Sequence, residues 1–203
     1  MIQKAARDFA KNECLPGVIE RDEKQQFPRE QIMKLADLGF LGMMVPEEFG
    51  GAGLDFSYSM VMAEALGECN CGGVPMAIGV QTDMATPALA RFGSDELKRE
   101  FLVPAIAGTA VSCIGVSEPG AGSDVANIKS HARKDGDDYV ISGSKMWITN
   151  GTQADWACML VNTSEGKVHA NKSLIVVPMD AKGIDRKTKL DKLGMRGSDT
   201  AMI

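Results

Sequence analysis

The hydrophobic periodicity of the chain changes once, near Thr109, and this change constrains the fold more than any other feature. Before Thr109, apolar residues recur at helical spacing. After it they alternate with the period of a strand. Helices therefore come first and strands second, without alternating βαβ units. The pattern predicts an α+β protein with an all-α N-terminal domain over 1–109 and a β domain over 110–203.

Apolar stripes in the first domain end at recognisable breakers. Pro16-Gly17 ends the first helix, Pro28 lies in the first turn of the second, and Gly39 fits the left-handed cap after it. Thr82 and Ser94 are predicted to cap the N-termini of two later helices. The predicted helices cover about residues 2–15, 28–38, 56–67, 82–92 and 95–108.

Short strands separated by turns make up the second domain. They are predicted at about 111–116, 139–141, 146–149, 156–161 and 174–177. Asp135-Gly136 is a hairpin signal. Several short strands of this kind predict an antiparallel β-barrel or sandwich. Residues 198–203 are strand-like and have no closing turn, so we expect the sequence to end within a domain, with an open sheet edge.

Size and charge limit the class of protein. A chain of 203 residues removes about 70% of its unfolded surface from water on folding. Its net charge of −5 disfavours non-specific binding to nucleic acid. No apolar run of about 18 residues predicts a membrane span. The first ten residues read as a helix and contain no signal-peptide core.

The five cysteines are scattered and lack paired CxxC spacing, which indicates reduced thiols in a reducing compartment. They are Cys14, Cys69, Cys71, Cys113 and Cys158. Cys69 and Cys71 could form half of a metal site, but only His131 and His169 could complete it. Packed or solvated side chains are the better interpretation, and no metal site is predicted.

Residues 113–124, Cys-Ile-Gly-Val-Ser-Glu-Pro-Gly-Ala-Gly-Ser-Asp, are an apolar run that ends in a glycine-rich turn. A dinucleotide loop is excluded because Val125 takes the third glycine position and no βαβ unit surrounds it. A Walker P-loop is excluded because no Gly-Lys-Ser/Thr closes the loop. The residues alone favour a β-turn, with Pro119 fixing φ and Gly120 or Gly122 taking a positive φ. The alternative interpretation is a bend whose backbone N–H groups bind a planar or phosphorylated ligand.

Residues 145–151, Lys-Met-Trp-Ile-Thr-Asn-Gly, offer an indole and a hydroxyl from alternating positions of a strand. Taken alone, Trp147 is interpreted as a core residue and Thr149 as a solvent-facing one. Lys145 is interpreted as a solvated charge. Arg196 could meet a phosphate, but an arginine in a solvated turn is the preferred interpretation.

In combination, these segments resemble the acyl-CoA dehydrogenase family. Three motifs carry the resemblance in the same order, at 117–124, 145–151 and 192–200, the last reading Lys-Leu-Gly-Met-Arg-Gly-Ser-Asp-Thr. The loop at 45–53 and the run at 92–108 also match, so the resemblance covers nearly the whole chain. A match in this many parts is specific, and it favours functional roles for the glycine turn and for Trp147.

The resemblance implies FAD as the cofactor, with its isoalloxazine ring against the β domain. It assigns the following residues to the flavin site: Ile114, Gly115, Val116, Ser117, Glu118, Pro119, Gly120, Ala121, Gly122, Ser123, Trp147, Ile148 and Thr149. Ser117 would bond to the ring, Trp147 would pack beside it, and Thr149 would lie near flavin N5. Ser123 would also bind the CoA part of the substrate. Donors at the ring stabilise the negative charge that develops as flavin accepts hydride.

The implied reaction is α,β-dehydrogenation of an acyl-CoA thioester to the trans-2-enoyl-CoA, in fatty-acid or branched-chain acyl-CoA catabolism. An electron-transfer flavoprotein would accept the electrons. The family's catalytic glutamate belongs to a C-terminal helical bundle that is missing from this sequence. No residue here is therefore assigned as catalytic, and Glu118 is not the base. We expect this chain alone to be inactive.

The family also implies a homo-oligomer, a tetramer, for the full-length parent. The expected compartment is the mitochondrial matrix in a eukaryote or the cytoplasm in a bacterium. Two alternatives stay open. One is a non-catalytic truncated isoform that retains affinity for flavin or CoA, and the other is a flavin oxidase or monooxygenase on the same fold.

Overall fold

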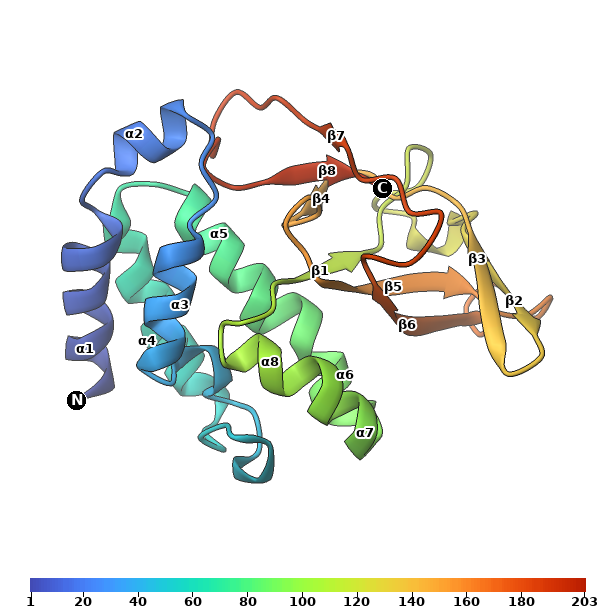
Figure 1. Cartoon of the computed structure of the whole chain (residues 1–203), viewed down its shortest axis with the longest axis horizontal. Coiled ribbons are helices and arrows are strands. Elements are labelled where there is room, and N and C mark those ends of the chain that lie inside the picture. The colour runs from blue at the N-terminus through green and yellow to red at the C-terminus, as the bar shows by residue number, and fades with distance from the viewer.

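The computed structural model describes all residues from Met1 to Ile203. Helices occupy the N-terminal half and sheets the C-terminal half (Figure 1). The α-helices are α1 (Ile2–Phe9), α2 (Val18–Glu23), α3 (Arg29–Asp37), α4 (Phe56–Leu66), α5 (Gly73–Gly79), α6 (Thr86–Phe92), α7 (Asp95–Leu97) and α8 (Val103–Ile106). π-Helical segments extend or join them: η1 (Ala10–Cys14), η5 (Val80–Ala85) and η6 (Lys98–Leu102). Short 3₁₀ turns are η2 (Phe40–Gly42), η3 (Glu47–Phe49), η4 (Gly67–Cys69) and η7 (Val125–Asn127).

Several local signals in the sequence are confirmed. Gly17 and Gly39 have positive φ values of 69° and 76°, as helix-breaking and capping glycines require. The Ser94 hydroxyl accepts a hydrogen bond from the backbone N–H of Leu97 at 3.3 Å. Pro28 differs slightly from its predicted place, because it lies at the N-cap of α3 and not inside the first turn.

One predicted helix boundary is wrong. The sequence predicted a helix over 82–92 with Thr82 as its cap, whereas α5, η5 and α6 form one helical run over 73–92. The Thr82 hydroxyl instead donates to the carbonyl of Ile78 at 3.1 Å within that run. The glycines at the start of this run have low helix propensity and hid it. Pro75 is tolerated because it lies in the first turn, where its missing N–H has no helical partner.

Two sheets make up the second half. The larger contains β1 (Ser112–Gly115), β2 (His131–Asp135), β3 (Asp138–Ser142), β5 (Trp156–Asn162) and β6 (Lys172–Pro178). The smaller contains β4 (Ile148–Thr149), β7 (Thr188–Lys189) and β8 (Thr200–Met202), in the order β4-β8-β7. The predicted hairpin at Asp135-Gly136 is confirmed: Asp135 pairs with Asp138, and Gly136 has a φ of 63°.

The predicted antiparallel barrel or sandwich is wrong, because the larger sheet is mixed. β5 pairs antiparallel with β6 along its whole length, and β1 and β2 both run parallel to β5 on its other edge. Alternating apolar residues reveal that a strand is present but not its direction. The chain leaves β1, forms the β2–β3 hairpin and the β4 segment, and only then returns to β1, which permits the parallel pairing.

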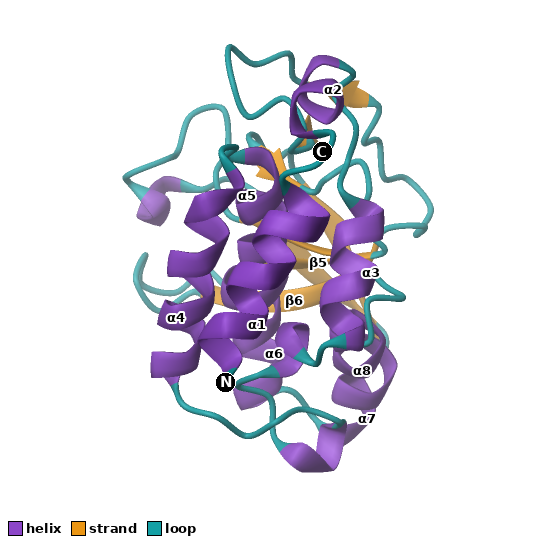
Figure 2. Ribbon diagram, turned by 90° about the vertical axis from the view of Figure 1, so that its left-hand side faces the viewer, coloured by secondary structure: helices purple, strands orange, loops and turns teal.

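The sheet packs against the helices through alternate residues of β5. Trp156 and Cys158 belong to the main core of 25 buried residues, whose other members all come from residues 1–109. Ala157, Met159 and Val161 point to the opposite face and join a second cluster of eight residues. Figure 2 shows the helices lying in front of β5 and β6. Strand periodicity thus divides one strand between two cores.

A buried polar seam joins the two halves. The side-chain amide of Gln81, in η5, donates to the carbonyls of Ala105 at 3.0 Å and Ala110 at 2.8 Å. Its oxygen accepts from the backbone N–H of Ser112 at 2.7 Å and from the Ser112 hydroxyl at 3.0 Å. Asn150 completes the seam by donating to the carbonyls of Ala77 and Ser112. The start of β1 is therefore fixed to the central helical run.

We expect Gln81→Leu to lower the free energy of unfolding by about 2–4 kcal/mol, because several buried polar groups lose their partner. Urea unfolding measures the change. Gln153→Leu is the matched control, since Gln153 is exposed and bonds only to its neighbour Thr152. Equal stability of the two variants would contradict a structural role for the seam.

Candidate functional site

The glycine turn follows β1 directly. Glu118 and Ala121 exchange two backbone hydrogen bonds, of 2.8 and 3.1 Å, across Pro119 and Gly120. A β-turn is therefore present, but the expected positive φ at Gly120 or Gly122 is wrong, because neither glycine has one. A type I turn with proline at its second position needs no positive φ. A Cβ atom on either glycine would meet nothing within 4 Å, so the outer side of the turn is bare.

Unpaired hydrogen-bonding groups gather on this bare side. The backbone N–H groups of Gly120, Gly122 and Ser123 have no partner within the chain. The hydroxyls of Ser117 and Ser123 also have none. Pro119, Gly120, Gly122 and Ser123 are exposed, so these groups face solvent. A row of outward donors beside open backbone suits a ligand with several acceptor atoms.

The indole of Trp147 lies beside β4 and is 61% exposed, so its interpretation as a core residue is wrong. Trp147 also has a φ of 66°, which is uncommon for a bulky residue. The predicted strand over 146–149 consists only of Ile148 and Thr149, because Trp147 departs from the extended conformation. Strain of this kind is a recognised mark of a functional position.

The structure brings the glycine turn and the Trp147 segment together. The backbone N–H of Met146 donates to the carbonyl of Ser117 at 2.9 Å. Ile148 is buried and pairs with Ala201, while Thr149 is half-buried and its hydroxyl has no hydrogen-bond partner. The predicted site residues from both motifs therefore form one neighbourhood, with Ile148 inside it and Trp147 on its surface.

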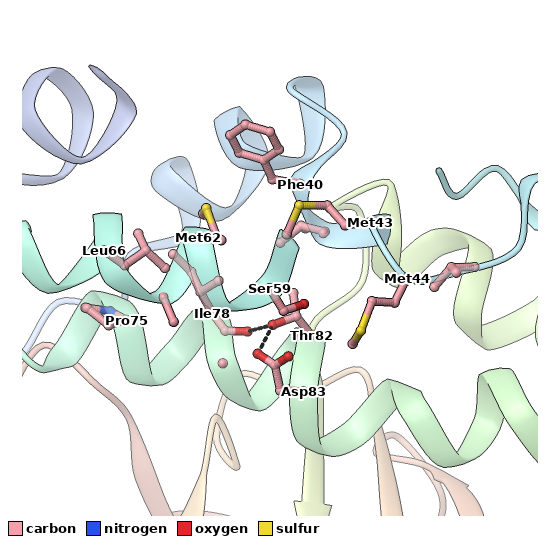
Figure 3. A pocket seen from close by; sticks show the side chains of 14 residues that line it. Phe40, Met43, Met44, Ser59, Met62, Leu66, Pro75, Ile78, Thr82 and Asp83 are labelled. Carbon is pink, nitrogen blue, oxygen red and sulfur yellow. Dashed lines mark hydrogen bonds between the residues drawn. The ribbon is translucent and has the colours of Figure 1, made fainter. Parts of the chain in front are cut away.

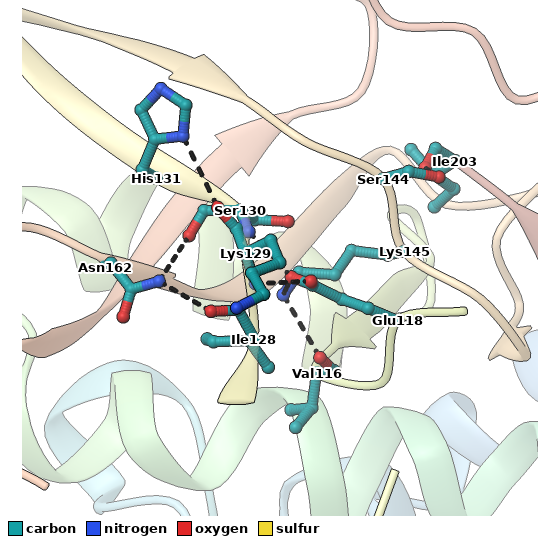
Figure 4. Close-up of polar contacts among 10 residues, drawn as sticks. All are labelled: Val116, Glu118, Ile128, Lys129, Ser130, His131, Ser144, Lys145, Asn162 and Ile203. Atoms are coloured by element: carbon teal, nitrogen blue, oxygen red, sulfur yellow. Dashed lines mark hydrogen bonds and ion pairs between the residues drawn. The ribbon is translucent and has the colours of Figure 1, made fainter. Parts of the chain in front are cut away.

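Beneath the turn lies an ion pair that the sequence did not reveal. The ammonium of Lys145 is 2.9 Å from a carboxylate oxygen of Glu118, and the two side chains are only 3% and 6% exposed (Figure 4). The Lys145 ammonium also donates to the carbonyl of Val116 at 3.1 Å. The carboxylate accepts from the N–H of Lys129 at 2.5 Å and of Ser130 at 2.9 Å.

The interpretation of Lys145 as a solvated charge is therefore wrong. The alternation of residues along a strand suggests that a lysine faces solvent. Only the position of Glu118 in space shows that Lys145 is instead buried and paired. The sequence did contain a signal for a buried lysine. A lysine within an otherwise apolar segment, together with a glutamate in a neighbouring motif, can indicate a paired charge.

The environment of Glu118 sets its charge. Burial alone would raise the pKa of this carboxyl, but hydrogen bonds from Ser130, Lys129 and Lys145 outweigh it and lower the pKa from 4.5 to about 2. Burial lowers the pKa of Lys145, and its pairing with Glu118 opposes that effect. Glu118 is thus an anion that is occupied with protein donors, which makes it unsuited to act as a base.

An apolar pocket of about 130 Å³ lies apart from this site, between α4, α5 and the segment after α3 (Figure 3). Its lining includes Met43, Met44 and Met62. Met60, Met76 and Met84 do not line it. Met60 and Met84 are exposed. A larger cavity of about 610 Å³ lies between the β2–β3 hairpin, β6 and the end of β8.

The other groups considered as ligand-binding candidates are Arg196 and the cysteines. Arg196 pairs with Asp191 at 2.7 Å and is not a freely solvated arginine. All five cysteines are free thiols. No group of three or more metal-binding side chains is present. None of the helices combines the length and the apolar character that crossing a bilayer requires.

This architecture, helices packed on a mixed sheet, is shared with solved acyl-CoA dehydrogenases. Residues 1–109 match the acyl-CoA dehydrogenase N-terminal domain, and residues 113–203 match the acyl-CoA dehydrogenase middle domain. The chain belongs to the acyl-CoA dehydrogenase family.

Individual relatives agree. The mitochondrial short-chain specific acyl-CoA dehydrogenase of Homo sapiens is 39% identical over all of this chain and 49% of its own length. An acyl-CoA dehydrogenase from Geobacillus kaustophilus superposes with a TM-score of 0.92 at 37% identity, over 98% of this chain and 53% of that one. A glutaryl-CoA dehydrogenase from Mycobacterium smegmatis, solved in complex with FADH2, has a TM-score of 0.90 at 32% identity, over 99% and 50%. The chain spans about half the length of these relatives.

Because the folded pKa of Glu118 is depressed, its stabilising contribution is present above pH 4.5 and is lost as pH falls through about 2. We expect Glu118→Gln to cost about 3 kcal/mol near neutral pH, since it leaves the buried Lys145 unpaired. The cost should shrink towards pH 2, where about half of the wild-type carboxyl groups are themselves protonated.

Urea unfolding across this acid range measures the difference between the two proteins. Glu165→Gln, at an exposed glutamate, is the control. A cost for Glu118→Gln that stays constant down to pH 2 would show that the carboxylate charge does not stabilise the fold.

Proposed function

We propose that the protein is the flavin-binding part of an acyl-CoA dehydrogenase, which converts an acyl-CoA thioester to the trans-2-enoyl-CoA with FAD as cofactor. Residues 1–109 serve as its N-terminal helical domain and 110–203 as its middle domain. The observation that carries the proposal is the row of unpaired donors on the glycine turn, which is hydrogen-bonded to the segment that carries the exposed indole of Trp147.

The chemistry of these groups fits FAD. An isoalloxazine ring has a flat apolar face and an edge of acceptor atoms, which match an indole and a row of N–H and O–H donors. The bare flank at Gly120 and Gly122 lets a ligand reach the backbone closely. Bound FAD supplies the hydride acceptor, which no side chain can provide.

We assign binding to Ile114, Gly115, Val116, Ser117, Glu118, Pro119, Gly120, Ala121, Gly122, Ser123, Trp147, Ile148 and Thr149. Ser117 and the turn N–H groups donate to the ring edge, and Trp147 keeps water from the ring face. The free hydroxyl of Thr149 donates near flavin N5, and Ser123 also holds the CoA moiety. Because Glu118 and Ile148 are buried, they contribute through their backbone only.

No residue of the chain is assigned as the catalytic base. In the complete enzyme we place acyl-CoA as the substrate, an electron-transfer flavoprotein as the acceptor and a homotetramer as the assembly. The name of the human relative includes the word mitochondrial, which supports a mitochondrial location for a eukaryotic protein. We place such a protein in the matrix and a bacterial one in the cytoplasm.

We expect Trp147→Ala to weaken FAD binding about tenfold, because aromatic packing on one ring face is lost. Isothermal titration of the chain with FAD measures the dissociation constant. Tyr139→Ala is the matched control, since Tyr139 is also an exposed aromatic residue but lies on the β2–β3 hairpin. Equal FAD affinities for the two variants would show that Trp147 does not contribute to FAD binding.

Activity separates the remaining alternatives. The complete gene product should reduce a dye acceptor when an acyl-CoA is added, while oxygen consumption in place of dye reduction would indicate an oxidase or monooxygenase. The 203-residue chain, assayed in parallel, should bind FAD without turnover. Robust turnover by this chain would overturn the assignment of no catalytic residue.

A further inference from the structure

The ion pair beneath the glycine turn joins segments that are far apart in the sequence. The Lys145 ammonium donates a hydrogen bond to the carbonyl of Val116, just before the turn. It also pairs with the carboxylate of Glu118, the first residue of the turn. The same carboxylate accepts from the N–H groups of Lys129 and Ser130, at the start of β2. The turn is thereby fixed both to the larger sheet and to the segment that contains Lys145.

The backbone around Lys145 extends this connection. Lys145 exchanges two hydrogen bonds with Ile203, of 2.6 and 2.9 Å, at the end of β8. The next residue, Met146, donates to the carbonyl of Ser117. Trp147 follows immediately, so the position of its indole relative to the turn depends on how Lys145 is held.

The pair itself cannot reach a ligand on the outer side of the turn. Both side chains are almost fully buried, whereas Gly120 and Trp147 are exposed. Gly115 confines the lysine further, because a Cβ atom there would lie 3.4 Å from Cγ of Lys145. A tightly confined pair in a low-dielectric interior is stiff, and binding groups need such support to keep their geometry.

We propose that Glu118 and Lys145 are a positioning pair that sets the spacing between the glycine turn and Trp147, and thereby the affinity and environment of the flavin. The inference rests on the proposed function. It concerns the two side chains, which act on the cofactor only through the segments they hold, and it explains why two charges are buried at a place where apolar side chains could have filled the space.

The test compares Lys145→Met, Lys145→Arg and the double variant Glu118→Gln/Lys145→Met in the 203-residue chain. Thermal unfolding without FAD reports stability, and titration with FAD at a temperature where each variant is folded reports affinity. The visible absorption and circular dichroism of bound FAD report its environment. Lys24→Met is the control, because Lys24 forms an exposed pair with Glu20 on α2.

Lys145→Met should weaken FAD binding at least tenfold and shift the flavin spectrum, and Lys145→Arg should restore part of both because it keeps the charge. The double variant should be more thermally stable than Lys145→Met, because it leaves no buried charge without a partner. Its FAD affinity should stay at least tenfold weaker than that of the wild type, because the side-chain link between the turn and the segment before Trp147 is lost.

Two results would overturn the inference. One is a double variant that regains FAD affinity along with stability, which would make the pair merely structural. The other is a folded Lys145→Met with wild-type affinity and spectrum. A wild-type chain that binds no FAD would instead overturn the proposed function, and the inference with it.

Discussion

The side chain of Gln81 is the contact on which the arrangement of the molecule depends. It is buried, and it uses both of its N–H groups and its oxygen, which accepts two hydrogen bonds. A buried amide is tolerated only when its polar groups are paired, so the helical run and the first strand must keep one relative position. β1 leads directly into the glycine turn. The orientation of the turn against the helices is therefore set by a hydrogen-bonded seam and not by apolar packing alone.

The ion pair beneath the turn illustrates a different balance. Removing two charges from water is costly, and their mutual attraction offsets that cost only with good geometry and further hydrogen bonds. Glu118 has three donors and Lys145 has two acceptors, so the pair meets this condition. Such an arrangement adds little to stability compared with apolar packing. Its value lies in direction, because hydrogen bonds fix the distance and angle between their partners, whereas hydrophobic attraction is non-directional.

Local chemistry explains which features were predictable from the sequence. Gly39, Ser94 and the Asp135-Gly136 hairpin follow rules that act within a few residues, and all three are confirmed. The start of the central helical run was missed because glycines lower helix propensity locally, while tertiary packing stabilises the run as a whole. The mixed sheet was missed because strand direction is decided by contacts distant in the sequence.

The order of helices and strands, the turn after β1 and the family resemblance were predictable because periodicity, turn residues and motifs occupy consecutive positions in the chain. The exposure of Trp147, the burial of Lys145 and its pairing with Glu118 became visible only in the folded chain. The physical reason is that burial and pairing are properties of neighbours in space. A lysine is solvated or buried according to what the fold places opposite it, and here the fold places a carboxylate there.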